Sequence, residues 1–210
     1  MSKSDHWNSI FSNTTDSKLG WYEADTSQTF KLLQSVEKWQ GSSIFISGIG
    51  TSQLVEQLLK NKVQLTLNDI SEQALASLKT RLGTQASQIH WLCQDISQPI
   101  NSNSDRQITE TIDIWIDRAV LHFLLDEKQI KGYFANLNDS LKPGGYALLA
   151  EFSKSAAPKC AGLPLHCYSV EELADRLGST YQLITSFDYE YISPTGDIKP
   201  YIYSLFKKIT

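Results

Sequence analysis

Three aspartates in this sequence each follow a short apolar run. A turn with two glycines follows another apolar run, earlier in the chain. The turn is Gly48-Ile49-Gly50-Thr51-Ser52, and the acids are Asp69, Asp95 and Asp117. Glycines let a ligand approach the backbone, and a carboxylate can accept hydrogen bonds from both hydroxyls of a ribose. Asp69 follows Gly48 by about 20 residues, which is the spacing of nucleotide-binding turns. The pattern indicates a site for a nucleotide-type cofactor, or else an ordinary turn with a surface aspartate.

Hydrophobic patterning predicts the elements that must position these residues. The apolar run 44–46 predicts a buried strand, and the run 54–59 predicts a helix that Thr51 or Ser52 would cap. Strands that alternate with helices predict an open, doubly wound α/β sheet, which binds ligands at the carboxyl ends of its parallel strands. The acids and the glycine turn should therefore meet in one site. The other expected strands and helices are strands at 63–67, 89–93, 112–116 and 146–150, and helices that begin after Ser71 and after Asp126.

The two ends of the chain have patterns of their own. Residues 6–22 are rich in aromatic side chains and are expected to pack on the rest of the chain, and residues 26–40 have helical spacing. A polar stretch at 97–111 predicts a loop. After a helix that Ser169 would cap, two strands joined by a turn at 193–197 predict an antiparallel hairpin at the end of the chain.

Length and composition limit the functions to consider. A chain of 210 residues with 41% hydrophobic and 20% charged residues is expected to form one domain. The net charge of −4 disfavours a protein whose main task is to bind nucleic acid. No apolar stretch predicts a signal peptide or a membrane span, so we expect a cytoplasmic protein without a membrane partner. The three cysteines have no framework spacing and are expected to be reduced, with Cys93 in the core.

In these features the sequence resembles the class I S-adenosylmethionine-dependent methyltransferases over nearly the whole chain. The segment Leu141-Lys142-Pro143-Gly144-Gly145 is similar to the turn that precedes strand five in that family. The resemblance implies a Rossmann-like, seven-stranded fold with a mostly parallel sheet and an antiparallel last strand, and S-adenosylmethionine as the cofactor. It also implies that the glycine turn contacts the methionine end, Asp69 the ribose and Asp95 the adenine. The cofactor-binding residues of this resemblance are Gly48, Ile49, Gly50, Thr51, Ser52, Asp69, Ile70, Asp95, Ile96, Asp117, Arg118 and Ala119.

The aromatic start of the chain has a narrower resemblance. Trp7, Phe11 and residues 20–22 are similar to the Trp- and Tyr-rich opening of small stand-alone methyltransferases and of some lysine methyltransferases. The resemblance implies a single methyltransferase domain over residues 1–210. In it, residues 1–40 would form an aromatic helical lid on a Rossmann-like core at 41–210, and Trp21 would fold over the cofactor.

Few residues are needed for the chemistry of methyl transfer. The enzyme must align the nucleophile, the methyl group and the leaving sulfur, and it needs a base only when the acceptor arrives protonated. His122 is a candidate base or acceptor-binding group, or a structural histidine, and Glu151 is a second catalytic candidate, or a surface acid. Cys160, His166 and Cys167 match no standard zinc spacing, so no metal site is expected.

These observations favour a methyltransferase that acts on a small molecule, with thiols among the candidates, or on a protein. One alternative is an NAD-dependent oxidoreductase on the same type of sheet, which Gln53 at the position of the third fingerprint glycine disfavours. A second alternative is a non-catalytic module that binds S-adenosylmethionine. It is motivated by Ile46, which stands where the family has an acid in strand one, and by the lack of an unmistakable catalytic base.

Overall fold

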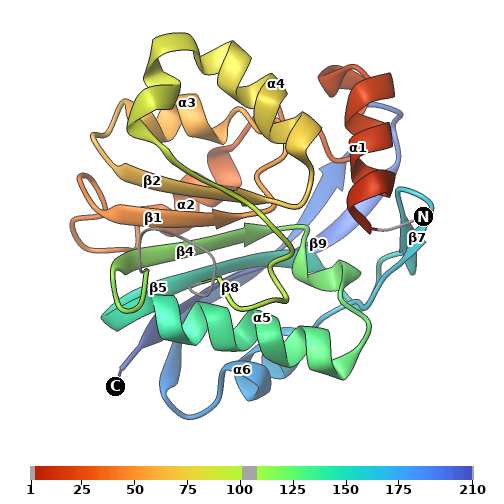
Figure 1. Cartoon of the computed structure of the whole chain (residues 1–210). Helices are drawn as coiled ribbons and strands as arrows, with labels where there is room; N and C mark the ends of the chain where they lie inside the picture. Colours follow the sequence, from red (N-terminus) through yellow and green to blue (C-terminus); the bar gives the residue numbers. More distant parts are fainter. Residues whose placement is uncertain (1–2, 101–107, 210) are drawn as a thin grey trace.

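Seven strands form one sheet in the computed structural model, which describes residues 3–100 and 108–209. Their order across the sheet is β3-β2-β1-β4-β5-β9-β8 (Figure 1). The five strands from β3 to β5 are parallel, and β9 is antiparallel to both of its neighbours. The expected seven-stranded, mostly parallel sheet with an antiparallel last strand is confirmed. The strands are β1 Ser43–Ser47, β2 Gln64–Asp69, β3 His90–Cys93, β4 Ile112–Arg118, β5 Leu141–Phe152, β8 Tyr181–Ile192 and β9 Ile198–Lys208.

Helices cover both faces of this sheet. One face carries α2 Ser27–Leu33, α3 Leu54–Leu59 and α4 Glu72–Leu82, and the other carries α5 Glu127–Ser140 and α6 Val170–Leu177. The helix α1 Lys3–Asn13 lies beside α4 and buries none of its residues. Within the described residues, none of the helices combines the length and the apolar character that crossing a membrane requires. The short elements are η1 Asp16–Lys18, η2 Gly83–Gln88, η3 Leu121–Phe123, β6 Lys159–Cys160 and β7 Leu163–Pro164.

Side-chain caps begin three of the helices where the sequence predicts them. Ser71, Asp126 and Ser169 each accept a hydrogen bond from a backbone N–H in the first turn of α4, α5 and α6 respectively. Such a cap stabilises a helix by about 1 kcal/mol. The helix α3 begins after Gln53, which makes no side-chain cap. The Ser52 hydroxyl accepts a hydrogen bond from the backbone N–H of Leu54, the first residue of the helix.

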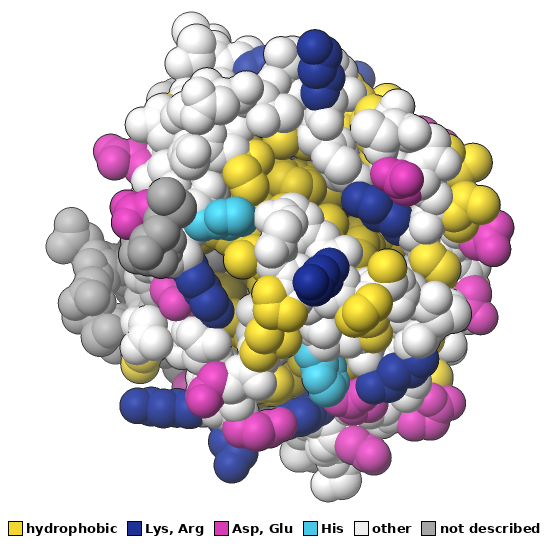
Figure 2. Space-filling model, turned by 90° about the vertical axis from the view of Figure 1, so that its right-hand side faces the viewer, with side chains coloured by type: hydrophobic (Ala, Val, Ile, Leu, Met, Phe, Trp, Pro, Cys, Tyr) yellow, Lys and Arg dark blue, Asp and Glu magenta, His cyan; other side chains and the backbone are white. Residues whose placement is uncertain are grey.

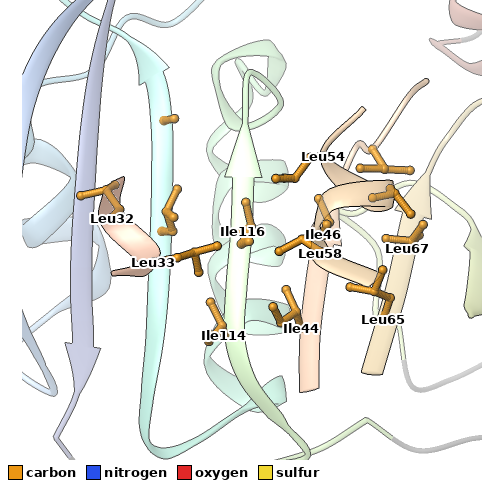
Figure 3. Close-up of a cluster of buried hydrophobic side chains, with 14 of the residues drawn as sticks. Leu32, Leu33, Ile44, Ile46, Leu54, Leu58, Leu65, Leu67, Ile114 and Ile116 are labelled. Carbon is orange, nitrogen blue, oxygen red and sulfur yellow. The ribbon is translucent and has the colours of Figure 1, made fainter. Parts of the chain in front are cut away.

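The hydrophobic core lies in two layers, one on each face of the sheet. In β1, Ile44 and Ile46 face the layer with α2 and α3, whereas Phe45 faces the other layer and stacks on Trp115 with ring centroids 4.1 Å apart. Figure 3 shows the first layer, in which leucines of α2 and α3 meet the isoleucines of β1 and β4. Central parallel strands bury both faces, which explains why β1 reads as a continuous apolar run.

Three sequence-based expectations need correction or qualification. The helix expected over 26–40 ends at Leu33 as α2, and turns follow it. The sequence predicts Cys93 in the core, but Cys93 is exposed, at the end of the edge strand β3. The expected loop at 97–111 lies partly outside the described residues.

Candidate functional site

A pocket lies at the carboxyl ends of the parallel strands. The arrowheads of β1 and β4 in Figure 1 point to the side that Figure 2 shows, and hydrophobic side chains gather in the middle of this face (Figure 2). Most of the residues that the sequence predicts for the site line this pocket. They are Trp21, Gly48, Ile49, Gly50, Thr51, Ser52, Asp69, Ile70, Asp95, Ile96, Arg118, Ala119 and His122. Two others, Asp117 and Glu151, lie outside its lining.

The turn after β1 requires glycine for two reasons. Gly48 and Gly50 have φ angles of +55° and +53°, which side chains rarely adopt. A Cβ at Gly48 would also come within 2.1 Å of the Val120 side chain, and one at Gly50 would come within 3.2 Å of the Phe11 ring. Gly48 has no room for a side chain, and at Gly50 the Phe11 ring would have to shift by a few tenths of an ångström. The backbone of this turn lines the pocket.

Asp69 joins this turn to the end of β2. Its Oδ2 accepts a hydrogen bond from Gly50 N at 2.7 Å, and its Oδ1 accepts one from Ser71 N at 2.8 Å. Burial raises the pKa of Asp69 to about 6, although these backbone hydrogen bonds lower it. The carboxylate is therefore fixed in position between the glycine turn and the start of α4. Asp95, at the next strand end, is half-buried and accepts a hydrogen bond from Ser97 N at 2.9 Å.

Arg118 lies at the end of β4 and holds the N-terminal segment against the sheet. Its Nε lies 3.2 Å from Glu23 Oε1 and 3.1 Å from the Tyr203 hydroxyl, and its Nη1 donates to the Trp21 carbonyl at 3.2 Å. The guanidinium also lies over the rings of Tyr191 and Tyr201. Glu23 lines the pocket, and the sequence analysis missed it because a single acid in a turn has no pattern.

Aromatic side chains cover part of the pocket. The Trp7 ring of α1 meets Trp21 and Phe123 edge-on, with centroids 5.5 and 4.9 Å apart. The ring of Phe11, on the same helix, also meets Trp21 edge-on, with centroids 6.1 Å apart. The aromatic residues of the first part of the chain therefore pack over the glycine turn, next to the segment after β4.

Next to the pocket, on the face of the sheet that carries α5, lies a buried cluster of acids. Glu151 Oε2 lies 2.7 Å from His122 Nδ1 and accepts a hydrogen bond from the His122 backbone N–H at 3.2 Å. The carboxyl groups of Glu151 and Asp117 contact each other, and Asp117 also accepts a hydrogen bond from Tyr133. Two carboxyl groups can share a hydrogen bond only when one of them is protonated.

Burial sets the charge of this cluster. It raises the pKa of Glu151 to about 8 and lowers the pKa of His122 to about 3, since neither charged form is solvated. Burial and the neighbouring Glu151 also raise the pKa of Asp117 well above its usual range. At neutral pH, His122 is therefore an uncharged imidazole at the pocket wall, and Glu151 reaches the pocket only through it.

The three soft side chains of the loop after β5 diverge. Cys160 lines the pocket, and Lys199 Nζ lies 3.8 Å from its sulfur. His166 turns to Glu172 on α6, and the Cys167 sulfur faces the Ala156 carbonyl. Across residues 3–100 and 108–209, no three His, Cys, Asp or Glu side chains are grouped as a metal site requires.

Comparison with known proteins gives one family and a set of shared folds. Residues 47–147 match the family model of a methyltransferase domain. No curated protein sequence matches the chain. A SAM-dependent methyltransferase from Anabaena variabilis ATCC 29413 has a similar structure, with a TM-score of 0.74 and 15% identity over 98% of this chain and 93% of that one.

Two further solved structures share the fold. The N-methyltransferase NodS from Bradyrhizobium japonicum WM9, in complex with S-adenosyl-l-homocysteine, has a TM-score of 0.69 and 16% identity over 98% of this chain and all of that one (100%). A structure from work on the conversion of a disulfide bond into a thioacetal group during echinomycin biosynthesis has a TM-score of 0.75. It is 13% identical over 98% of this chain and 92% of that one.

Proposed function

Since the chain carries an S-adenosylmethionine-dependent methyltransferase domain, we propose that it transfers a methyl group to a small acceptor that enters the pocket beside His122. The observation that carries this proposal is the position of Asp69. Its buried carboxylate is held at the glycine turn by Gly50 N, inside the pocket that His122 also lines.

The residues of the pocket fit S-adenosylmethionine. Asp69 offers a buried carboxylate to the ribose hydroxyls, and Asp95 with Ile96 would lie against the adenine. The positive-φ turn at Gly48 and Gly50 leaves the backbone open to the methionine end, and Trp21 covers it. The remaining proposed contacts are Ile49, Thr51, Ser52, Ile70, Arg118 and Ala119, which all line the pocket, and Asp117, which would act from behind it by accepting a hydrogen bond from Val120 N.

The cofactor supplies a methyl group on a sulfonium, and the task of the chain is to align the acceptor with it and to exclude water. Trp7, Trp21 and Phe123 supply an apolar wall for this purpose. Because this cover narrows the approach to the pocket, it favours a small-molecule acceptor over a protein one. The acidic net charge makes a nucleic acid the least favoured acceptor.

His122 is the proposed acceptor-binding group and the candidate base for an acceptor that arrives protonated. Its imidazole is uncharged at neutral pH, so it can accept a hydrogen bond from the acceptor, but burial lowers its pKa to about 3 and makes it a weak base. Glu151 does not reach the pocket and is a positioning residue, because it contacts both Nδ1 and the backbone N–H of His122. An acceptor that arrives as an anion would need neither residue.

The proposal extends to the whole chain. We place residues 1–210 in one methyltransferase domain, with the lid function of residues 1–40 concentrated in α1, which buries none of its residues. Its three cysteines are all free thiols, which supports a role in the reducing cytoplasm.

Calorimetric titration with S-adenosylmethionine, S-adenosylhomocysteine and NAD tests the cofactor. We expect the first two to bind and NAD not to bind. Asp69→Ala should weaken binding roughly 100-fold, because two hydrogen bonds to a charged acceptor are lost. Asp175→Ala, which removes an exposed acid of α6, is the control and should bind as the wild type does. Binding of NAD alone would replace the methyltransferase assignment with an oxidoreductase.

The pH dependence of cofactor binding gives a second test of Asp69, in the wild type and in the isosteric variant Asp69→Asn. Because the pKa of Asp69 is about 6, affinity for S-adenosylhomocysteine should fall as the pH drops below about 6. Asp69→Asn keeps the volume and one hydrogen-bond acceptor, so its weaker affinity should not change between pH 5 and 7. An unchanged affinity in both Asp69 variants would contradict the ribose assignment.

A further inference from the structure

Two opposite charges lie together in an aromatic part of the pocket. Glu23 and Arg118 both line it, with side chains only 8% and 13% exposed, and Arg118 Nε lies 3.2 Å from Glu23 Oε1. The groups packed around them are the rings of Tyr191, Tyr201 and Tyr203. A charge pair placed there loses much of its hydration, so it needs further partners to be stable.

Arg118 has binding capacity that the protein does not use. Its Nε and Nη1 are taken by Glu23, Tyr203 and the Trp21 carbonyl. Its Nη2 is buried and has no hydrogen-bond partner among the described residues. Burial opposes the charge, but the Tyr203, Tyr201 and Glu23 side chains raise the pKa of Arg118, so the guanidinium stays cationic. A cationic donor without a partner at a pocket wall indicates an anionic ligand group.

The pair lies beside the glycine turn. Ser47 of β1 pairs with Asp117 of β4. The next residues, Gly48 and Arg118, therefore lie at the same end of these two strands. Glu23 is held there by its neighbour Tyr22, whose hydroxyl accepts a hydrogen bond at 2.7 Å from Gln53 Nε2, at the start of α3. Asp69 ends β2 and Asp95 follows β3, so these other acids of the pocket wall lie on the far side of the turn.

We propose that Glu23 and Arg118 bind the amino acid end of S-adenosylmethionine, Glu23 its ammonium group and Arg118 its carboxylate. This inference rests on the proposed function. Each charge of the zwitterionic amino acid end would then lie beside an opposite charge of the protein. Arg118 Nη2 would gain the hydrogen-bond partner that it lacks. Strand β1 has the apolar Ile46 and supplies no acid, so the acid for the ammonium comes instead from the N-terminal segment.

The test compares ligands that differ only in this end. Affinities of S-adenosylhomocysteine and of 5′-methylthioadenosine, which lacks the amino acid, are measured by calorimetry for the wild type, Glu23→Gln and Arg118→Gln. Each variant should lose at least about tenfold in affinity for S-adenosylhomocysteine and keep its affinity for 5′-methylthioadenosine. Glu127→Gln removes an exposed glutamate that pairs with Arg176 on the surface, and it should change neither affinity.

A third ligand separates the two roles. Decarboxylated S-adenosylmethionine keeps the ammonium and lacks the carboxylate, so the wild type should prefer S-adenosylmethionine to it by about tenfold or more. Arg118→Gln should abolish this preference, and Glu23→Gln should retain it. Arg118→Lys, which keeps the charge, should recover part of it.

Other outcomes overturn the inference. Equal losses for both thioether ligands would mean that the pair only supports the pocket. An unchanged affinity for S-adenosylhomocysteine, with a higher KM for the methyl acceptor, would assign the pair to the acceptor. If the wild type bound neither ligand, the proposed function itself would fail, which is a different result from a failure of the two variants alone.

Discussion

At the scale of single residues, a carboxylate can be part of a site without touching a ligand. Asp117 and Glu151 lie near the carboxyl ends of β4 and β5, as Asp69 lies at the end of β2, yet their side chains lie on the face of the sheet that carries α5. There they hold a proton between them and contact His122 and Tyr133. Their role in the proposed function is to fix the uncharged imidazole of His122 at the pocket wall.

This cluster makes stability depend on pH in a defined direction. The folded protein keeps a proton on Glu151 up to about pH 8, whereas the unfolded chain releases it near 4.5. The free energy of unfolding should therefore fall as the pH rises from 6.5 to 8, by up to about 2 kcal/mol. Asp69 does not oppose this trend, because its pKa values in both states lie below 6.5. His122 opposes it by only about 0.4 kcal/mol, because its imidazole is half protonated in the unfolded chain at pH 6.5 and uncharged in the folded protein.

Chemical denaturation at pH 6.5 and pH 8 measures this effect. Glu151→Gln, which cannot ionise, should show a smaller fall than the wild type. Glu190→Gln, on the exposed side of β8, should behave as the wild type does. An equal fall in all three proteins would mean that Glu151 is ionised in the folded state at pH 6.5.

At the scale of elements, the first 40 residues divide into two parts that are attached differently. Residues 20–23 are bound to the sheet through Arg118 and Lys199, and Tyr191 donates a hydrogen bond to the Tyr22 carbonyl. The helix α1 buries none of its residues and is held by aromatic contacts and a few polar ones. We infer that α1 can open while residues 20–23 remain part of the pocket wall.

Asn8 is the polar attachment of α1 that can be removed most simply. Its Oδ1 accepts hydrogen bonds from Ser71 Oγ at 2.8 Å and from Gln73 N at 3.3 Å. Without these hydrogen bonds, the free energy needed to open α1 should be about 1 kcal/mol lower. Amide exchange in α1 should therefore be roughly fivefold faster in Asn8→Ala than in the wild type. Asn13→Ala is the matched control, because the Asn13 amide bonds only within its own helix, to Ser9. Similar exchange in both variants would show that the Asn8 hydrogen bonds do not hold α1 in place.

At the scale of the whole molecule, the pocket joins parts of the chain that are far apart in sequence. Its lining runs from Lys3 on α1 to Tyr201 on β9. One core layer connects α2 with β1 and β4, so the segment before the first strand shares its burial with the central sheet. This arrangement supports the proposal of one domain over the chain.

Native-state hydrogen exchange in mild denaturant tests the single domain. Leu32 and Leu33 of α2 are fully buried against the sheet, so their amides should exchange only through the global unfolding that exposes Ile114 and Ile116 of β4. The free energies of exchange and their denaturant slopes should coincide. A smaller slope for α2 would mean that the N-terminal segment unfolds as a separate unit.

Much of the fold and of the site can be predicted from the sequence, because the patterns that indicate them are local. The succession of strands and helices in the alternating part, the caps at Ser71, Asp126 and Ser169, and the position of Asp69 beside the glycine turn follow from patterns within about 20 residues. Only the tertiary structure decided where the remaining side chains lie. It turned Asp117 away from the pocket and left Cys93 exposed on an edge strand. It also brought Glu23 to Arg118. The face that a strand residue takes and the partner it meets depend on packing between segments distant in sequence, and no local pattern encodes that packing.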